Sequence, residues 1–417
     1  MLKKIQNNKK LIENIISLFS LRGLEYLLGF ITFPYLVRVL GPTNYGAMAF
    51  AQSLAFYFIM VVDYGFNLTG PRKIALSPKS EHGKIFMSIF YAKFILLFIC
   101  TILLAIILNI FNEVFIEKEI FWAAYLSVLG NAIFPIWFFL GIQKMRYITL
   151  VNLLSRLITT LCIFLLVTTP NDYVLATLFQ AVVPIFAGIF SFIILIQKYD
   201  YLFVKCTICD IKNMFIDSWD IFISNIASSI YSVSNTFFLG LLTNNTIVGY
   251  FSSAKKIIDA IVGLSAPIAQ ALFPYINEKI AKSKQDTIIF IKKCTFIICG
   301  SNFIISISIL LFTNIFIEAL LGNSFKETEL ILKIMSFLPF ITSISELFGV
   351  QTLIPFGYKN IFSKIVVSSA FLNLIIIFPF IYYFQAEGAA LAILITSVFY
   401  SFMCWYALKK HNISILL

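Results

Sequence analysis

Nine ionisable side chains stand inside long apolar stretches of this sequence. They are Arg22, Glu25, Asp63, Lys93, Arg156, Lys255, Lys256, Asp259 and Glu346. At the centre of a membrane helix each such charge costs about 2.5–3.5 kcal/mol, so something must compensate it. The basic side chains could hold an anion, because an arginine fork matches pairs of phosphate oxygens and lysine supplies a mobile point charge. We therefore predict that the basic residues bind phosphate.

Two of these groups could also be simple ion pairs. Arg22 and Glu25 are spaced i, i+3, and Lys255 or Lys256 can reach Asp259 on the next helical turn. Each set either faces a shared cavity or forms a salt bridge that only fixes helix packing. Intramembrane charges are functional candidates by default, which favours the cavity. The residues that we predict to bind substrate are Arg22, Glu25, Lys93, Arg156, Lys255 and Lys256.

The single charges have alternatives of their own. Lys93 and Arg156 bind substrate or extend their long side chains to lipid headgroups. Asp63, Asp259 and Glu346 are predicted to be coupling or structural charges. Asp63 and Glu346 in particular hold an arginine partner or bind a coupling proton, and their positions in the sequence do not decide between the two.

The composition is that of a polytopic membrane protein. Of the 417 residues, 60% are hydrophobic and only 12% are charged, and mean hydropathy is +0.93. A soluble globular protein carries about 25% charged residues, so that class is excluded. The net charge of +11 would suggest nucleic acid in a soluble protein. Here its placement along the chain is what carries information, and we predict no nucleic-acid partner.

Twelve apolar runs are long enough to cross a bilayer. They cover roughly residues 12–38, 46–70, 85–111, 119–141, 149–168, 173–197, 219–242, 248–272, 289–312, 329–354, 360–384 and 388–408. About 20 helical residues span the hydrocarbon core, and only helices satisfy their own backbone groups there. We predict an all-α fold of twelve transmembrane helices. Those that contain prolines 34, 135, 184, 267, 339 and 379 should be kinked or broken.

The connections between these runs are unequally charged. Twenty-two Lys and Arg residues fall on one side, against four on the other, namely Arg38, Lys118, Lys326 and Lys333. The positive-inside rule therefore places both termini in the cytoplasm. The four tryptophans, at 122, 137, 219 and 405, lie near span ends and are predicted to form an interfacial belt, with platforms for sugar stacking as the alternative.

The chain also repeats internally. LLTNNTIVGYFSSAKKI in the seventh and eighth runs matches VLGPTNYGAMAFAQSL in the first two, pairing Gly46 with Gly249 and Ala51 with Ala254. Six helices per half make the repeat parallel, with a pseudo-two-fold axis along the membrane normal. We predict an N-terminal bundle over residues 1–200 and a C-terminal bundle over residues 201–417, around a central cavity.

Signatures of enzymes and of cofactor sites are weak or missing. Gly41 and Gly46 have the spacing of a phosphate loop, but Ala47 and Met48 stand where Lys and Ser or Thr are required. Cys206 and Cys209 form a lone C-x-x-C, which is weak evidence for a metal. We predict no catalytic residue, no metal and no cofactor, and hence that the protein is not an enzyme.

Several segments resemble one known family. PYLVRVLGPTNYG, VVDYGFNLTGPRKIA, PIWFFLGIQKMRYITLVNLLSRL, VGYFSSAKKI and PIAQALFPYI follow one another in the order seen in O-antigen flippases (Wzx type). These belong to the polysaccharide transporter family of the multidrug/oligosaccharidyl-lipid/polysaccharide exporter superfamily. The resemblance covers nearly the whole chain and is most specific in the first two runs.

The resemblance implies a function. It implies two six-helix bundles around a cationic cavity, in the bacterial inner membrane, that move undecaprenyl-diphosphate-linked oligosaccharide from the cytoplasmic to the periplasmic leaflet by alternating access. Membrane lipids are further partners, and association with the polysaccharide polymerase machinery is an additional expectation. Two alternatives stay open: a cation-coupled multidrug exporter of the same superfamily, which would need an acidic and aromatic cavity, and a membrane glycan polymerase or ligase.

Overall fold

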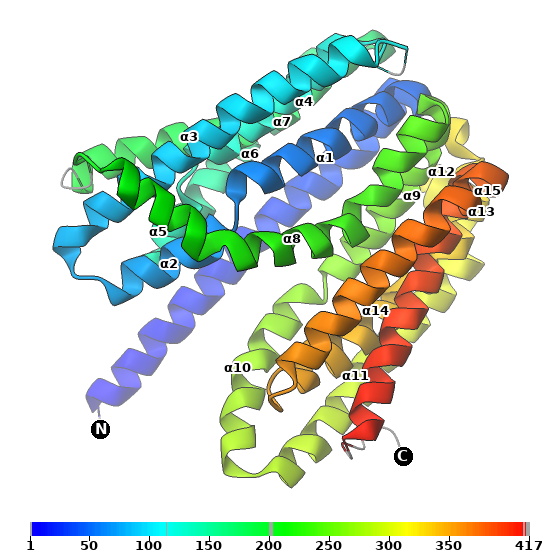
Figure 1. Cartoon of the computed structure of the whole chain (residues 1–417). Helices are drawn as coiled ribbons and strands as arrows, with labels where there is room; N and C mark the ends of the chain where they lie inside the picture. The colour runs from blue at the N-terminus through cyan, green and yellow to red at the C-terminus, as the bar shows by residue number, and fades with distance from the viewer. Residues whose placement is uncertain (1, 114, 200–202, 412, 414–417) are drawn as a thin grey trace. The chain divides into compact units, whose positions relative to one another are not determined.

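The computed structural model describes residues 2–113, 115–199, 203–411 and 413, and within them all regular structure is helical (Figure 1). The side chains of residues 2–26, 227–232, 266, 267, 270 and 271 lie outside the described part. A fold made only of helices is what the apolar runs predict for a chain in lipid.

The helices follow one another with short connections. The α-helices are α1 (Leu2–Asp63), α2 (Phe66–Leu76), α3 (Lys79–Ile110), α4 (Lys118–Ile133), α5 (Ile136–Gly141), α6 (Met145–Leu166), α7 (Tyr173–Lys198), α8 (Ile208–Leu242), α9 (Asn245–Gly263), α10 (Ala266–Lys282), α11 (Lys284–Leu311), α12 (Thr313–Leu320), α13 (Thr328–Met335), α14 (Leu338–Ser345) and α15 (Lys359–Lys410). The 3₁₀ turns η1 (Pro170–Asp172) and η3 (Asn323–Phe325) and the π-helix η4 (Glu346–Leu353) complete the described elements.

Eight segments of the described chain are long and apolar enough to cross a membrane. Two of them, Leu27–Leu76 and Lys359–Lys410, contain 50 and 52 residues, whereas one crossing needs about 20. Each of these two contains a residue with a non-helical backbone, Gly41 (φ 70°) and Gln385 (φ 46°) respectively. The chain is therefore a multi-pass membrane protein.

Prolines account for several of the helix breaks, as predicted. Pro135 separates α4 from α5, and Pro267 and Pro339 occupy the second positions of α10 and α14. Proline has no N–H to give to the preceding turn, so it is accommodated at the start of a helix. By contrast, Pro184 lies within the uninterrupted α7.

The chain forms two compact units. Unit 1 comprises Met1–Leu40 and Ala51–Ile226, and unit 2 comprises Gly41–Phe50 and Ala227–Leu417. Both α1 and α8 thus contribute residues to each unit. The predicted boundary between residues 200 and 201 stays a prediction.

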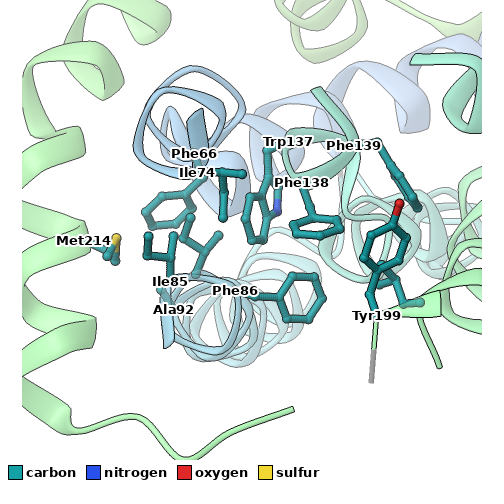
Figure 2. Close-up of a cluster of buried hydrophobic side chains, with 12 residues drawn as sticks. Phe66, Ile74, Ile85, Phe86, Ala92, Trp137, Phe138, Phe139, Tyr199 and Met214 are labelled. Carbon is teal, nitrogen blue, oxygen red and sulfur yellow. The ribbon is translucent and has the colours of Figure 1, made fainter. Parts of the chain in front are cut away.

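Unit 1 has an aromatic core where α2, α3, α5 and the start of α8 meet (Figure 2). Trp137 is only 2% exposed, and its ring lies 5.3 Å from that of Phe86. A Cβ on Gly70 would come within 2.9 Å of the Trp137 ring, so the helix passes directly over the indole. Trp137 is therefore a core residue, and the prediction that it belongs to an interfacial belt is wrong.

The core of unit 2 lies between α10, α11, η4 and α15. Its buried side chains include Ile276, Ile291, Phe348, Ile365 and Cys404. Gly349 lets η4 approach α15, because a Cβ there would lie 2.7 Å from the Phe362 ring. The irregular η4 is thus held by packing against regular helices.

A second close approach in unit 2 joins the two copies of the sequence repeat. A Cβ on Gly46 would lie 1.7 Å from the carbonyl oxygen of Asn245, and a Cβ on Gly249 would lie 1.9 Å from that of Pro42. The hydroxyl groups of Thr43 and Thr246 are hydrogen-bonded at 2.8 Å. Each contact is the counterpart of the other under the repeat, so the two segments cross reciprocally and need glycine to do so.

Polar contacts attach the start of α8 to α2 and α3 within unit 1. Lys73 pairs with Asp217, and Lys84 Nζ lies 2.8 Å from Asp210 Oδ1. The buried hydroxyl groups of Thr69 and Ser218 are hydrogen-bonded at 2.8 Å. The contacts lie two turns apart along α8 and fix both its position and its rotation.

The Lys84–Asp210 contact predicts an acid-dependent loss of stability. The Lys84 ammonium and the Thr207 hydroxyl and amide groups lower the pKa of Asp210 to about 2, whereas an unfolded Asp titrates near 3.9. The carboxylate therefore stabilises the fold above about pH 4 and loses its effect as pH falls toward 2. Unfolding temperatures in nanodiscs should show Asp210→Asn below wild type at pH 6, with the difference shrinking from pH 4 to 2.5. A difference that widens in acid would contradict this assignment.

Candidate functional site

The structure describes the side chains of seven of the nine embedded charges. Arg22 and Glu25 lie in α1, and their side chains are outside the described part. Of the others, Asp63, Lys93 and Arg156 belong to unit 1, and Lys255, Lys256, Asp259 and Glu346 to unit 2. Each unit therefore has its own polar centre.

The centre of unit 1 is a buried ion pair. Lys93 Nζ lies 3.2 Å from Asp63 Oδ1, and the two side chains are 1% and 16% exposed. A side chain so enclosed does not extend to headgroups, so the snorkelling alternative is wrong for Lys93. The partner of Asp63 is therefore a lysine and not the arginine that the sequence suggested as one alternative. Both charged groups are shielded from water, so removing one of them would leave the other as an uncompensated buried charge and destabilise the fold.

Two helix breaks explain why a lysine fits at this point. Asp63 ends α1, and the next two residues, Tyr64 (φ 46°) and Gly65 (φ 81°), turn in the left-handed region. Lys93 Nζ also lies 3.5 Å from the carbonyl oxygen of Asn131. That carbonyl would bond the amide four residues on, but this residue is Pro135, which has none. The ammonium thus meets a carboxylate, a helix C-terminus and a freed carbonyl.

Arg156 lies beside α1. Its guanidinium Nη2 is 3.3 Å from the position that a Cβ on Gly29 would occupy. The side chain is exposed. Gly29 follows position 25 by four residues, and positions so spaced share a helix face. Arg156 is therefore placed at the face of α1 that carries the Glu25 position.

The centre of unit 2 combines an ion pair and a second lysine. Lys255 Nζ lies 2.5 Å from Asp259 Oδ2 one turn along α9, and their side chains are 22% and 55% exposed. Of the two alternatives for this group, the ion pair is present, formed by Lys255 rather than Lys256. Lys256 is exposed on the next position of the same helix. A half-exposed pair of this kind contributes little to stability, so its lysine can exchange partners at small cost.

Glu346 starts the π-helix η4 and has an amide as its neighbour. Gln351 Nε2 donates to Glu346 Oε1 at 3.3 Å and to the carbonyl oxygen of Ala269 at 3.0 Å. No described cation forms a salt bridge with this half-buried carboxyl group. π-helices are rare and frequent at functional sites, because the extra residue re-aims side chains. The geometry leaves Glu346 able to accept a proton.

Unit 2 contains a row of buried, hydrogen-bonded polar side chains that the sequence does not predict. Asn235 Nδ2 is 3.4 Å from Asn373 Oδ1, and Asn373 Nδ2 is 3.2 Å from Thr396 Oγ1. All three residues are fully buried, and Asn235 Oδ1 has no partner. Uncharged residues in apolar runs give only a weak signal, which is why they were missed. Among the described residues no group of His, Cys, Asp and Glu is placed to hold a metal ion.

The structure joins four of the embedded charges into two ion pairs. Within unit 1 it joins Lys93 to Asp63, and within unit 2 Lys255 to Asp259. The exposed Arg156 and Lys256 and the half-exposed Lys255 have the donors that an anionic ligand requires. The substrate-binding role of all of them stays a prediction.

Solved structures of two membrane proteins share the fold. One is described as "Lipid II flippase MurJ, inward closed conformation" (TM-score 0.73, 14% identity, covering 94% of this chain and 87% of the other). The second is an inward-facing multidrug resistance MATE family transporter of the MOP superfamily (TM-score 0.67, 15% identity, covering 93% and 98%). At these identities the likeness concerns the fold alone.

Sequence comparison is more specific. The chain is 35% identical over 395 residues, 94% of both chains, to a protein of Escherichia coli (strain K12) named "Putative O-antigen transporter". It is 31% identical to one of the same name from Shigella dysenteriae, covering 93% of this chain and 97% of the other. A family model described as Polysaccharide biosynthesis protein matches residues 11–280. The chain belongs to this polysaccharide biosynthesis protein family of membrane transporters.

Proposed function

We propose that this protein is a flippase that moves undecaprenyl-diphosphate-linked repeat units of O-antigen, or of a related polysaccharide, across the inner membrane to the periplasmic leaflet. The observation that carries the proposal is the 35% identity, over 94% of both chains, to the protein named as an O-antigen transporter. The embedded basic residues support it, because a diphosphate cannot cross lipid without compensation of its charge.

The described residues suggest a division of roles. We assign the diphosphate to Arg156 and Lys256, which are exposed, to the partly exposed Lys255, and to the Arg22 position in α1. Lys93 is enclosed with Asp63 and holds its helices together. Glu346, with an amide for a partner, is the better candidate for a coupling proton. No step in this scheme breaks a covalent bond, and none needs an enzyme activity or a polymerase partner.

The proposed topology has twelve spans and both termini in the cytoplasm. Gly41 and Gln385 divide the two longest apolar segments into four crossings. The α8 segment and the α9–α10 segment, which fall outside the eight clear candidates, supply two more. The charge asymmetry of the connections supports the orientation. We propose that the halves alternate access to a central cavity, as parallel repeats allow.

The drug-exporter alternative rests only on the shared fold. The MATE structure is 15% identical to this chain, and a fold supports many functions. The embedded charges also argue against this alternative. Five of the nine are basic, whereas a cavity for cationic drugs should be acidic and aromatic.

A leaflet-exchange assay tests the proposal. Fluorescent undecaprenyl-diphosphate oligosaccharides with several repeat structures are placed in vesicles with wild type or with Arg22→Gln. Losing a charged hydrogen bond of about 1.5–3 kcal/mol predicts exchange that is about 10- to 100-fold slower. Neutralising Arg22, Lys255 and Lys256 together should abolish it. Arg146→Gln, at an exposed position at the start of α6, makes the same chemical change and should exchange like wild type.

The outcomes separate function from mechanism. If wild type moves no lipid-linked sugar of any repeat structure, the proposed function is wrong. If the triple variant exchanges as fast as wild type, the protein is a flippase whose anion site lies elsewhere.

A further inference from the structure

Unit 2 contains a cavity of about 660 Å³ between the α8–α9 connection and the break in α15. Its walls are formed by residues 242–244 and 247 on one side and by residues 378, 379, 381–383 and 385 on the other. The volume lies within the range of about 300–1,000 Å³ that is usual for small-molecule sites. Its lining includes none of the embedded charges of α9 and η4.

The polar groups of this cavity can both donate and accept hydrogen bonds. Asn244 caps α9, its Oδ1 accepting from the amide of Ile247 at 3.0 Å, so its NH₂ group remains available. Thr243 Oγ1 donates to the carbonyl oxygen of Leu239 at 2.6 Å and keeps its lone pairs. The side-chain amide of Gln385 bonds no other described residue. Such a set matches hydroxyl groups, which are donors and acceptors at once.

Aromatic surface stands beside these polar groups. Tyr382 and Tyr383 are 80% and 74% exposed, and their rings meet at 87° with centroids 5.1 Å apart. The wall behind is firm, because the Phe238 and Phe378 rings pack at 4.7 Å. An exposed aromatic face beside hydrogen-bonding groups is suited to a ligand with an apolar C–H face and a polar edge. A pyranose ring has both.

The lining disfavours other ligands. Among the described residues that form the cavity none is charged, so a phosphate or a carboxylate would be buried there without a counter-charge. An acyl chain would fill the apolar part but offer no hydrogen bond to the NH₂ group of Asn244 or to the amide of Gln385. A neutral saccharide satisfies both the rings and the polar groups.

The backbone of Gln385 gives an independent indication. With φ 46° and ψ −119° it adopts a conformation that glycine reaches readily and other residues do not. Just beyond it, Gly388 packs so closely that a Cβ would lie 1.9 Å from the carbonyl oxygen of Phe380. A glycine would serve the turn better than glutamine does. Strain of this kind is typical of sites where the side chain itself has a task.

We propose that this cavity binds a neutral saccharide, with Tyr382 and Tyr383 contacting the C–H faces of the sugar rings and Asn244 and Gln385 bonding their hydroxyl groups. The proposal rests on the proposed function for the source of the sugar, namely the saccharide part of the translocated lipid. In the proposed topology the cavity lies at the periplasmic end of unit 2, where that saccharide would emerge.

Binding is measured without a lipid carrier. Neutral tri- and tetrasaccharides of hexoses and N-acetylhexosamines are titrated into the full-length protein in nanodiscs, and saturation-transfer difference NMR gives their dissociation constants. Replacing both Tyr382 and Tyr383 by leucine should weaken binding about tenfold or more, since two ring contacts are lost. Inorganic diphosphate should not compete with the sugars.

Two variants separate a ligand site from a membrane anchor. Phe384 is 54% exposed beside the tyrosines but does not line the cavity, so Phe384→Leu should bind saccharide like wild type. Gln385→Gly relieves the strained backbone and removes the amide. It should therefore raise the unfolding temperature and yet weaken binding, whereas a structural glutamine would change stability only.

The proposal is overturned if no saccharide gives a saturable signal, or if the tyrosine variants bind as wild type does. Equal losses of stability in the Tyr382, Tyr383 and Phe384 variants, without a change in binding, would identify interfacial anchoring. Leaflet exchange by wild type is scored separately. A protein that flips lipid but binds no free saccharide refutes this site alone, and one that binds saccharide but flips nothing refutes only the proposed function.

Discussion

Alanine at Gly46 or Gly249 is expected to leave almost no folded protein. The added Cβ would lie 1.7 Å from the Asn245 oxygen in the first variant and 1.9 Å from the Pro42 oxygen in the second. Both obstacles are backbone atoms, so no side chain can rotate away. Overpacking usually costs about 1–3 kcal/mol, and a backbone collision inside a helix crossing should exceed that range. Fluorescence-detected size exclusion of a fusion protein should show aggregates at the void volume.

A matched glycine controls for the substitution itself. Gly300 is exposed in α11 and no atom lies within 4 Å of its Cβ position. Gly300→Ala should therefore fold normally and be slightly more stable, since alanine loses less backbone entropy in a helix. If Gly249→Ala elutes and melts like Gly300→Ala, the two repeat segments do not cross as closely as described.

Removing the charge of Lys93 alone should also be severely destabilising. In Lys93→Met the carboxylate of Asp63, with a side chain only 16% exposed, would lose its ammonium partner. Breaking a buried pair in this way costs about 3–5 kcal/mol, because an uncompensated charge remains inside. The unfolding temperature in nanodiscs should fall sharply. Lys282→Met, which breaks the exposed pair with Glu278, should leave it unchanged.

The neutral double variant separates structure from transport. Asp63→Asn with Lys93→Met leaves no charge at the site, so most of the lost stability should return. If the pair only holds α1, α3 and α4 together, leaflet exchange should return as well. A double variant that is as stable as wild type but exchanges no lipid would instead make Lys93 a substrate or coupling residue. A Lys93→Met protein with an unaltered unfolding temperature would show that Lys93 and Asp63 are not a buried pair.

The length and composition of the apolar runs reveal the fold class of this chain, but not which faces of the helices are buried inside the protein. A run of about 20 apolar residues predicts a membrane helix whatever its neighbours are. Trp137 was assigned to the interface because it stands near the end of a run, yet α2 and α3 cover it. In lipid both buried and exposed helix faces are apolar, so hydrophobicity does not distinguish them.

The candidate site was predictable where two charges share one helix. The i, i+4 spacing brings Lys255 and Asp259 together whatever the tertiary structure is. The pairing of Lys93 with Asp63 depends on how α3 packs against the end of α1, which no spacing rule contains. The repeat indicated that Gly46 and Gly249 are equivalent. That the two segments also pack against each other is seen only in the three-dimensional structure.

The ten residues Gly41–Phe50 have a consequence for any attempt to divide the chain. They belong to unit 2, but the chain on either side of them belongs to unit 1, so the polypeptide passes between the units at three junctions, the third being at residues 226 and 227. Unit 2 is therefore not a continuous stretch of sequence. A single cut between residues 226 and 227 would separate Gly46 from Gly249 and so remove the crossing of the two repeat segments from unit 2.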